Sequence, residues 1–418
     1  MNYLIKSATI IAPQHPLHRQ KRDLLIADGV IQKMAQKIEN KEAYPEINLP
    51  NLHISIGWMD SSVSFGEPGF EERETLENGL RVAALSGFTA IGLNPNSNPM
   101  IDDSSGVNYL KFKSQDAATE VHPIGCFTKS ANGSDMAELY DMKQNGAIAF
   151  YDSKKPIQNA NLLKMGLLYC QSFDGLLMSF PQEVTTSYGN KANESAFTLS
   201  LGFEGTPDLS EALQVSRDLQ LLEYTEGKLH IPTISTEKSV KQIKEAHKKG
   251  LQVSCSVAAH HLVLTDAELE NFDTNFKVNP PLRNEKDLKA LQKGVKEGTI
   301  ALLTSDHQPL DIDNKMKEFS YAKFGSIGLE SFFGAVHTVL ELDEIIECIT
   351  TNPRIIFKLP IPEIKEGAEA NLTFFNPDPT WVFSEKDILS TSKNAAFLGK
   401  KMKGEVYGIM RGNRLVLK

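Results

Sequence analysis

The stretch KLHIPTISTEKSVKQIKEAHKKGLQVSCSVAA, from Lys228 to Ala259, decides the fold class, because it reads as a strand, a helix and a second strand. Its middle begins with Ser and Thr, carries Lys and His in the last turn, and is followed by Gly250. These are the usual start and stop signals of a helix. Two short apolar strands joined by such a helix normally pair in parallel. The stretch therefore predicts one strand–helix–strand unit.

The same alternation extends over most of the chain. ERETLENGLRVAALSG predicts a helix over 72–87 and FTAIGLNP a buried strand, while EKDLKALQKGVKEG and TIALLTSDH repeat the pattern near residue 300. Repeated units of this kind predict a parallel α/β structure, either a barrel or a doubly wound sheet. Residues 1–52 and the segment after about Pro360 instead read as β, with a hairpin signal at Asp28-Gly29 and a Gly412-Asn413 turn near the C-terminus. We expect the two termini to pair into one small β layer beside the barrel.

Composition excludes several classes of protein. The chain has 418 residues, of which 41% are hydrophobic and 23% charged, and a net charge of -9 without a basic stripe, so nucleic acid is not an expected partner. Its first twenty residues lack the features of a signal peptide, and no apolar run is long enough for a membrane. The four cysteines are scattered, which argues against a disulfide framework. We expect a cytoplasmic protein that does not bind membranes.

Several strings resemble dihydroorotases of the amidohydrolase superfamily, in that family's order along the chain. They are PGFEERETLENGLRVAALSGFTAIGLNPNSNPMID, AAHHLVLTD, KVNPPLRNEKDLKALQKGVKEGTIALLTSDHQP and the C-terminal EGAEANLTFFNPDPTWVF. The resemblance implies a (β/α)8 TIM barrel over residues 53–360. It also implies a small β-sandwich formed by residues 1–52 and 361–418, with the site at the C-terminal ends of the barrel strands. Barrels of this family are usually at least dimeric, so we expect a homo-oligomer.

The metal-ligand positions of the family hold other residue types here. Where the family has Asp-x-His-x-His-x-Arg-Glu-Pro-Gly, this chain reads DSSVSFGEPG over 60–69, with Ser62 and Ser64 in place of histidines and Gly66 in place of the arginine. Phe180 and Thr233 occupy the two other histidine positions, and Leu310 that of a substrate-binding histidine. Asp306 is retained, and Asp152 matches a possible bridging acid.

Hydroxyl and phenyl groups are poor substitutes for imidazole, and zinc needs about three nitrogen, thiolate or carboxylate ligands. The resemblance therefore implies a degenerate member of the family with no expected cofactor, and a structural role as a partner of aspartate carbamoyltransferase. Without a metal, the buried Asp306 should be protonated or hydrogen-bonded to Ser62, Ser64, His230 or His307. We also expect Phe180, Phe65 and Leu310 to fill part of the former cavity.

Other interpretations stay open. The chain could be a working dihydroorotase with an atypical zinc site, converting N-carbamoyl-L-aspartate to dihydroorotate, or a cyclic-amide hydrolase of another specificity. Serine, threonine and aspartate oxygens could bind a hard ion such as magnesium, and Ser62 or Ser64 could act as a nucleophile with a nearby histidine as base. His53 or His230 could supply alternative ligands. The old pocket could bind a small molecule, and four residues match substrate contacts or lie beside them: Asn96, Asn279, His260 and His261.

Overall fold

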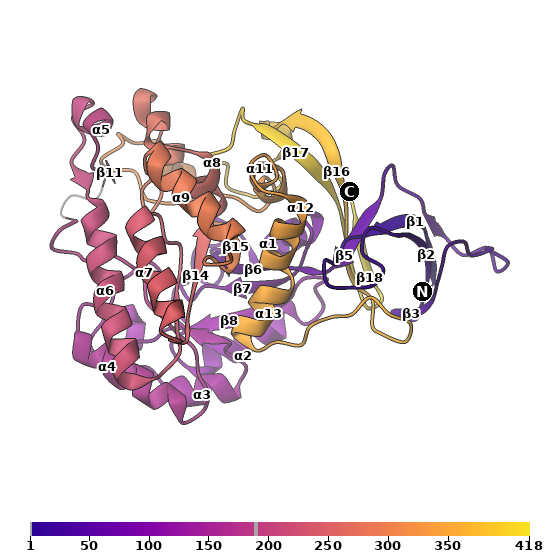
Figure 1. The fold of residues 1–418 in the computed structure, drawn as a ribbon, viewed down its shortest axis with the longest axis horizontal. Helices are drawn as coiled ribbons and strands as arrows, with labels where there is room; N and C mark the ends of the chain where they lie inside the picture. The colour runs from indigo at the N-terminus through magenta and orange to yellow at the C-terminus, as the bar shows by residue number, and fades with distance from the viewer. Residues whose placement is uncertain (1, 188–190) are drawn as a thin grey trace.

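A computed structural model describes residues 2–187 and 191–418. Most of these residues build a barrel whose eight parallel strands follow chain order, with helices around the outside (Figure 1). The strands are β6 (Trp58–Val63), β7 (Phe88–Leu93), β8 (Glu120–Gly125), β9 (Ala149–Phe150), β10 (Leu177–Met178), β13 (Leu229–Ile231), β14 (Val253–Ala258) and β15 (Leu302–Thr304). The (β/α)8 prediction is confirmed.

The outer layer consists of the helices that connect these strands. They are α1 (Leu76–Leu85), α2 (Ser104–Ser114), α3 (Leu139–Gln144), α4 (Ala160–Gln171), α6 (Asp208–Thr225), α7 (Glu237–Lys248), α9 (Glu285–Lys296), α12 (Leu342–Ile349) and α13 (Thr351–Phe357). Shorter pieces lie in the loops: α5 (Ala196–Ser200), α8 (Ala259–Val263), α10 (Ile312–Lys315), α11 (Phe332–Val336) and a two-stranded ribbon of β11 (Ala192–Asn193) and β12 (Gly205–Thr206).

Local chemistry sets the helix ends. The α7 helix begins after Thr236, whose side chain accepts a hydrogen bond from Ser239 N, and Gly250 follows its end at a φ of +78°. The predicted first barrel helix starts later than expected, at Leu76, because Thr75 is its N-cap. Glu74, which the prediction placed in the helix, instead accepts hydrogen bonds from Thr391 N and Oγ1, at 2.9 and 2.8 Å.

A carboxylate holds the seam where the first and last barrel strands meet. Asp60 on β6 accepts hydrogen bonds from Ser305 N at 2.9 Å, Thr304 Oγ1 at 2.5 Å and Ser62 N at 3.0 Å. Just beyond the two strands, Ser64 N donates to His307 O at 2.8 Å. Burial raises the pKa of Asp60 to about 6, and the three donors oppose that rise. The seam thus depends on one enclosed side chain.

The termini form a separate β domain with its own apolar core. Its strands are β1 (Tyr3–Ile10), β2 (Lys21–Ala27), β3 (Val30–Ala35), β4 (Glu46–Ile47), β5 (His53–Ile56), β16 (Asn371–Val382), β17 (Lys401–Arg411) and β18 (Arg414–Leu417). They hydrogen-bond in the order β18-β17-β16-β5-β1-β2-β3, with β4 beside β1. Strand β5 therefore belongs to this domain, although the sequence analysis began the barrel at residue 53. His53 lies on it, with its ring tilted against that of Phe375 at a centroid distance of 5.8 Å, and away from the barrel mouth.

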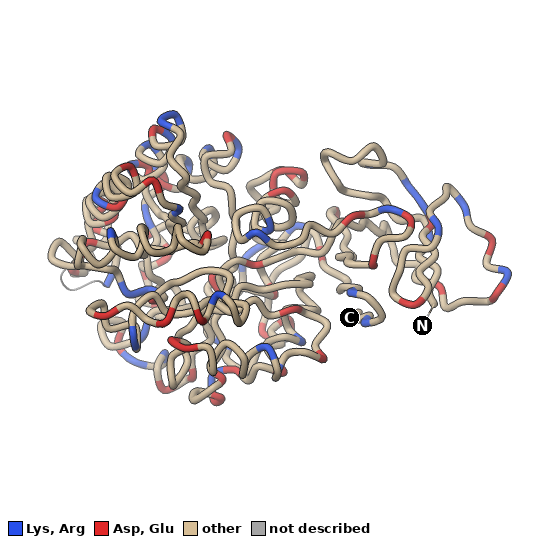
Figure 2. The backbone as a smooth tube through the Cα atoms, turned by 90° about the horizontal axis from the view of Figure 1, so that it is seen from below, with Lys and Arg blue, Asp and Glu red and all other residues tan. Residues whose placement is uncertain are grey.

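The predicted hairpins of the two termini are present. Strands β2 and β3 are joined at Asp28 and Gly29, both with positive φ, and β17 and β18 are joined at a turn that contains Gly412. Trp58 connects the β domain to the barrel, because its ring lies within 6.1 Å of those of Phe88, Phe333 and Phe375. Figure 2 shows basic and acidic residues interspersed over both domains. Among the described helices, none combines the length and the apolar character that a membrane span requires.

We expect Asp60→Ala to lower the free energy of unfolding by about 3 kcal/mol, because it leaves the enclosed backbone N–H groups of Ser62 and Ser305 without an acceptor. Thermal and urea unfolding of the full chain measure this. Glu42→Ala, which removes an exposed acid, is the matched control. A loss no larger than that of the control would show that the seam does not depend on Asp60.

Candidate functional site at the barrel mouth

The residues singled out in the sequence gather around the C-terminal ends of the barrel strands. Ser62 lies near the end of its strand and each of the others follows its strand by no more than three residues, which places the set as a ring around one end of the barrel. Its members are Ser62 and Ser64 at β6, Asn96 after β7, Asp152 after β9, Phe180 after β10, Thr233 after β13, His260 and His261 after β14, and Asp306 after β15. Asn279 joins them from the loop before α9, where Asn279 Nδ2 donates to Gln182 Oε1 at 3.3 Å.

The two serines share one partner. Asn94, directly after β7, donates from Nδ2 to Ser62 Oγ at 3.1 Å and to Ser64 Oγ at 3.2 Å. All three side chains are buried. The amide therefore bridges two hydroxyl groups at the positions where the resemblance implies imidazole ligands.

Asp306 is paired with a lysine that the sequence analysis did not consider. Lys154 Nζ lies 2.5 Å from Asp306 Oδ2, and the two side chains are 17% and 4% exposed. The expectation that Asp306 would bond to Ser62, Ser64, His230 or His307 is wrong. Burial raises the pKa of Asp306, while the ammonium of Lys154 acts in the opposite direction. A charged amine of the chain thus lies at the acid retained from the family pattern.

Asp152 and Thr233 are both held by contacts within the barrel wall. Asp152 accepts hydrogen bonds from Thr128 N at 2.8 Å and from Thr128 Oγ1 at 2.5 Å, and burial raises its pKa. Thr233 has a left-handed backbone, with φ at 49°, and its N–H donates to Ser256 Oγ at 3.1 Å. Both oxygens of Asp152 are therefore committed to a neighbouring loop.

The buried histidines of the mouth are uncharged at neutral pH. Burial lowers the pKa of His230 and of His261 to about 3 and that of His307 to about 4, and that of His260 lies well below its usual value. His230 Nδ1 is 2.8 Å from Ser254 Oγ, and His261 Nε2 is 3.0 Å from Pro280 O. His307 Nδ1 accepts from Gly328 N at 3.1 Å, so the ring proton of this residue lies on Nε2.

The apolar residues expected in the old cavity have separate locations. Phe180 belongs to the apolar cluster inside the barrel, with Met178 and Tyr151. The ring of Phe65 packs over Gly79 of α1 and edge-on against the ring of His307 at the mouth, with the two ring centroids 5.9 Å apart. Leu310 lines a cavity of the outer loops. Its N–H donates to Asn394 Oδ1 at 3.1 Å.

These side chains do not fit the metal that the fold family implies. Ser62, Ser64 and Thr233 offer neutral hydroxyls, Phe180 offers no donor atom, and Lys154 places a positive charge against Asp306. In residues 2–187 and 191–418, no group of three or more His, Cys, Asp or Glu side chains is arranged to hold a metal ion. Zinc takes about three such ligands, and a nearby ammonium repels a dication.

The mouth also lacks a base positioned to activate a serine nucleophile, among the residues that the structure describes. In the described part of the chain, no histidine nitrogen is hydrogen-bonded to Ser62 or Ser64, whose hydroxyls both face the Asn94 amide. Five buried polar atoms of the mouth nevertheless have no hydrogen-bond partner among those residues: Asn94 Oδ1, Thr233 Oγ1, His260 Nε2, His261 Nδ1 and His307 Nε2. Such atoms are normally satisfied by water or a ligand. The mouth thus contains buried polar atoms without hydrogen-bond partners, but no nucleophile paired with a base among the described residues.

Sequence reasoning missed Lys154 and Asn94. Both stand in strand-end loops already under consideration, Lys154 in AFYDSKKP and Asn94 in NPNSNP. The usable signal for Lys154 was electrostatic, because a buried acid without a metal needs a cation, and a lysine two residues after Asp152 reaches the same mouth. Nothing in the sequence distinguished Asn94 from Asn96.

Comparison with known proteins shows the family of the chain. Residues 53–239 match the family described as "Dihydro-orotase-like", and residues 230–416 match the "Amidohydrolase family". The dihydroorotase of Caldicellulosiruptor saccharolyticus is 37% identical over 99% of this chain and 98% of that protein. That of Syntrophus aciditrophicus is 34% identical over 100% and 99%.

Solved structures agree on the fold. The L-hydantoinase (dihydropyrimidinase) from Arthrobacter aurescens superposes with a TM-score of 0.87 at 18% identity, covering 100% of this chain and 96% of that one. The D-hydantoinase (dihydropyrimidinase) from Thermus sp. gives a TM-score of 0.82 at 18% identity, covering 100% and 97%. With full-length relatives above 30% identity, the chain belongs to the dihydroorotase family of amidohydrolase-fold proteins.

Proposed function

We propose that this chain is a dihydroorotase-like protein of pyrimidine biosynthesis that has no zinc centre and serves as a structural partner of aspartate carbamoyltransferase. The observation that carries the proposal is the 2.5 Å contact between Lys154 Nζ and Asp306 Oδ2. The chain itself supplies the positive charge that this acid would otherwise receive from a metal. Four of the family's ligand positions have changed type around it, at Ser62, Ser64, Phe180 and Thr233.

The surface supports a role in an assembly. On α4, Met165, Leu168 and Tyr169 are 44–45% exposed and fall at i, i+3 and i+4, which places them on one face. Leu209 and Leu213 are similarly exposed on α6, which packs against α4. Contiguous exposed apolar surface is typical of protein interfaces. We propose this face, defined by these five residues, as the contact with aspartate carbamoyltransferase.

A second candidate is an active dihydroorotase with an atypical site, which would convert N-carbamoyl-L-aspartate to dihydroorotate. Two observations favour it: the curated relatives carry that name, and the mouth retains five buried polar atoms without partners among the described residues. A ligand with complementary donors and acceptors would satisfy them. Under this alternative, zinc would have to be held by a ligand set other than the family's.

Metal content and turnover separate the two candidates. We expect the full chain, purified without chelator from zinc-supplemented cells, to contain far less than one zinc ion per chain. Inductively coupled plasma mass spectrometry measures this content. We also expect no cyclisation of N-carbamoyl-L-aspartate above the background of an Asp306→Asn variant, which is the matched control for contaminating enzyme. Stoichiometric zinc together with a rate that Asp306→Asn abolishes would establish the second candidate instead.

The Lys154–Asp306 pair can be tested through stability. We expect Lys154→Met to cost about 3 kcal/mol at neutral pH, because it leaves a buried carboxylate without its cation. When the pKa of a carboxyl is higher in the folded state than in the unfolded chain, the group stabilises the fold at low pH. This contribution is lost as the pH rises from the unfolded-state pKa to the folded-state pKa. Without Lys154 the pKa of Asp306 rises further, so the loss should be small near pH 5 and grow towards pH 8.

Unfolding of the variant across that pH range checks the prediction. The double variant Lys154→Met/Asp306→Asn is the control, and it should recover most of the lost stability at every pH, because no charge is then buried alone. A pH-independent loss that the double variant retains would mean that Lys154 stabilises the fold by packing and not by charge.

The assembly is tested with purified components. Size-exclusion chromatography with light scattering of this chain mixed with aspartate carbamoyltransferase from the same cells should show a complex. Leu168→Asp should abolish it with little change in melting temperature, because the side chain is 44% exposed. Phe112→Asp, at a 70% exposed position on α2, is the control and should leave the complex intact. A chain that never captures this enzyme would contradict the proposed partnership.

A further inference from the structure

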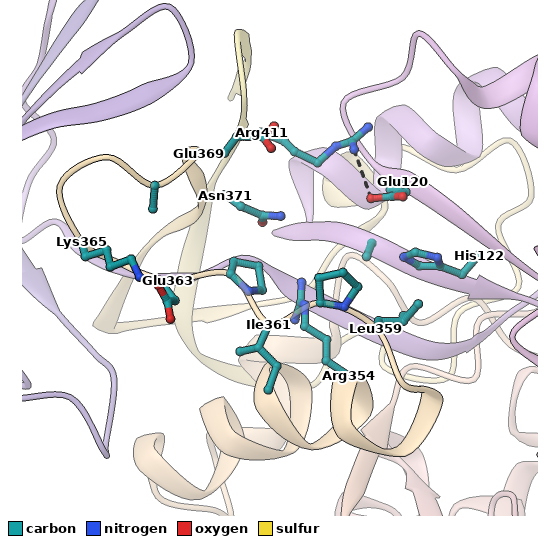
Figure 3. Close-up of a pocket in the computed structure, with 14 residues that line it drawn as sticks. Glu120, His122, Arg354, Leu359, Ile361, Glu363, Lys365, Glu369, Asn371 and Arg411 are labelled. Carbon is teal, nitrogen blue, oxygen red and sulfur yellow. Dashed lines mark hydrogen bonds and ion pairs between the residues drawn. The ribbon is translucent and has the colours of Figure 1, made fainter. Parts of the chain in front are cut away.

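A second polar cavity lies at the end of the barrel opposite the mouth, where the barrel meets the terminal β domain (Figure 3). Its volume is about 470 Å³, within the usual size of ligand pockets. Glu120 and His122 border it from the start of β8, Arg354 from α13, and Asn371 and Arg411 from β16 and β17. These elements belong to both domains, so the cavity spans their junction.

Arg354 is a buried cation in this cavity with few partners. Its side chain is 3% exposed, and its NH1 group donates to Thr350 O at 2.8 Å, the residue that separates α12 from α13. Among the described residues, no carboxylate lies within ion-pair distance of this guanidinium. Burial lowers the pKa of Arg354 to about 10, so it stays charged at neutral pH. A guanidinium has five N–H donors, and buried charges are normally paired.

Further donors face the same space. Figure 3 shows the guanidinium of Arg354 extending towards the wall that carries Asn371, whose amide nitrogen points into the cavity, and the ring of His122 on another wall. Asn371 Oδ1 is enclosed and has no hydrogen-bond partner in the described part of the chain. Burial lowers the pKa of His122 to about 4, so its neutral ring offers one N–H at neutral pH.

No acid around the cavity forms an ion pair with Arg354 among the described residues, although the charge of Glu120 favours the charged guanidinium. Glu120 is bound to Arg411 at 3.1 Å, which neutralises it, although it still faces the cavity. Glu363 pairs with Lys365 at the rim, and Glu369 is exposed there. The deepest charge in the cavity is therefore the positive charge of Arg354.

We propose that this cavity binds a small oxyanion, the phosphate or carboxylate group of a metabolite, with Arg354 as its main contact and Asn371 as a second donor. The planar fork of a guanidinium matches two oxygens of either group, which an ammonium cannot do. The cavity exceeds the size of the anion alone and so leaves room for the body of the metabolite. This site is independent of the barrel mouth and of the function proposed for it.

Titration calorimetry of the full chain with inorganic phosphate, and separately with succinate, at constant ionic strength tests the proposal. We expect saturable binding of at least one of the two anions and a melting temperature that rises with its concentration, because the ligand binds only the folded chain. Binding of phosphate alone would assign a phosphorylated metabolite, and binding of succinate alone a carboxylate.

Arg354→Gln should abolish this binding, and Arg354→Lys, which keeps the charge but loses the fork, should weaken it about tenfold. Arg81→Gln, an exposed arginine on α1, is the matched control and should bind as the unaltered chain does. The lysine variant keeps the test valid if the glutamine variant does not fold. No saturable binding of either anion, or equal affinity in the unaltered chain and the Arg354 variants, would overturn the proposal.

Discussion

The carboxylate of Asp60 joins the first and last strands of the barrel. It accepts hydrogen bonds from Thr304 and Ser305 at the end of β15 and from Ser62 N on its own strand, all at 3.0 Å or less. A parallel barrel must close on itself to leave no unpaired strand edge. The contacts of Asp60 set the relative positions of Ser62 on one strand and Asp306 on the other. The geometry of the mouth therefore follows from the closure of the barrel.

At the mouth, the electrostatics differ from those of a metal site. A divalent ion would gather several anionic or imidazole ligands around a single positive centre. Here the ammonium of Lys154 meets Asp306, the Asn94 amide meets two serine hydroxyls, and Asp152 is turned to Thr128. These polar groups are hydrogen-bonded or ion-paired to other side chains of the mouth, and a few buried polar atoms have no hydrogen-bond partner among the described residues. The same fold thus persists with a different distribution of charge at its centre.

The two polar regions of the molecule contrast in this respect. At the mouth, the retained acid has a cation beside it, while at the opposite end the buried guanidinium of Arg354 has no acid within ion-pair distance among the described residues. Buried charges are costly unless they are compensated, so an uncompensated one in an accessible cavity is a better indication of a ligand than a compensated one. The junction of the two domains is therefore a candidate ligand site, which the sequence alone did not indicate.

Local patterns in the sequence determined the barrel units, the hairpins at Asp28-Gly29 and near Gly412, and the start of α7 at Thr236, because caps, turns and apolar periodicity act over a few residues. The resemblance to dihydroorotases, and not these local patterns, implied that Ser62, Phe180, Thr233 and Asp306 lie at the C-terminal ends of the strands. Only the tertiary structure decided that Lys154 meets Asp306 across 152 residues, that Phe65 packs between Gly79 and His307, and that β5 joins the terminal sheet. These outcomes depend on which distant groups the closed barrel brings within contact, and spacing along the chain does not contain that information.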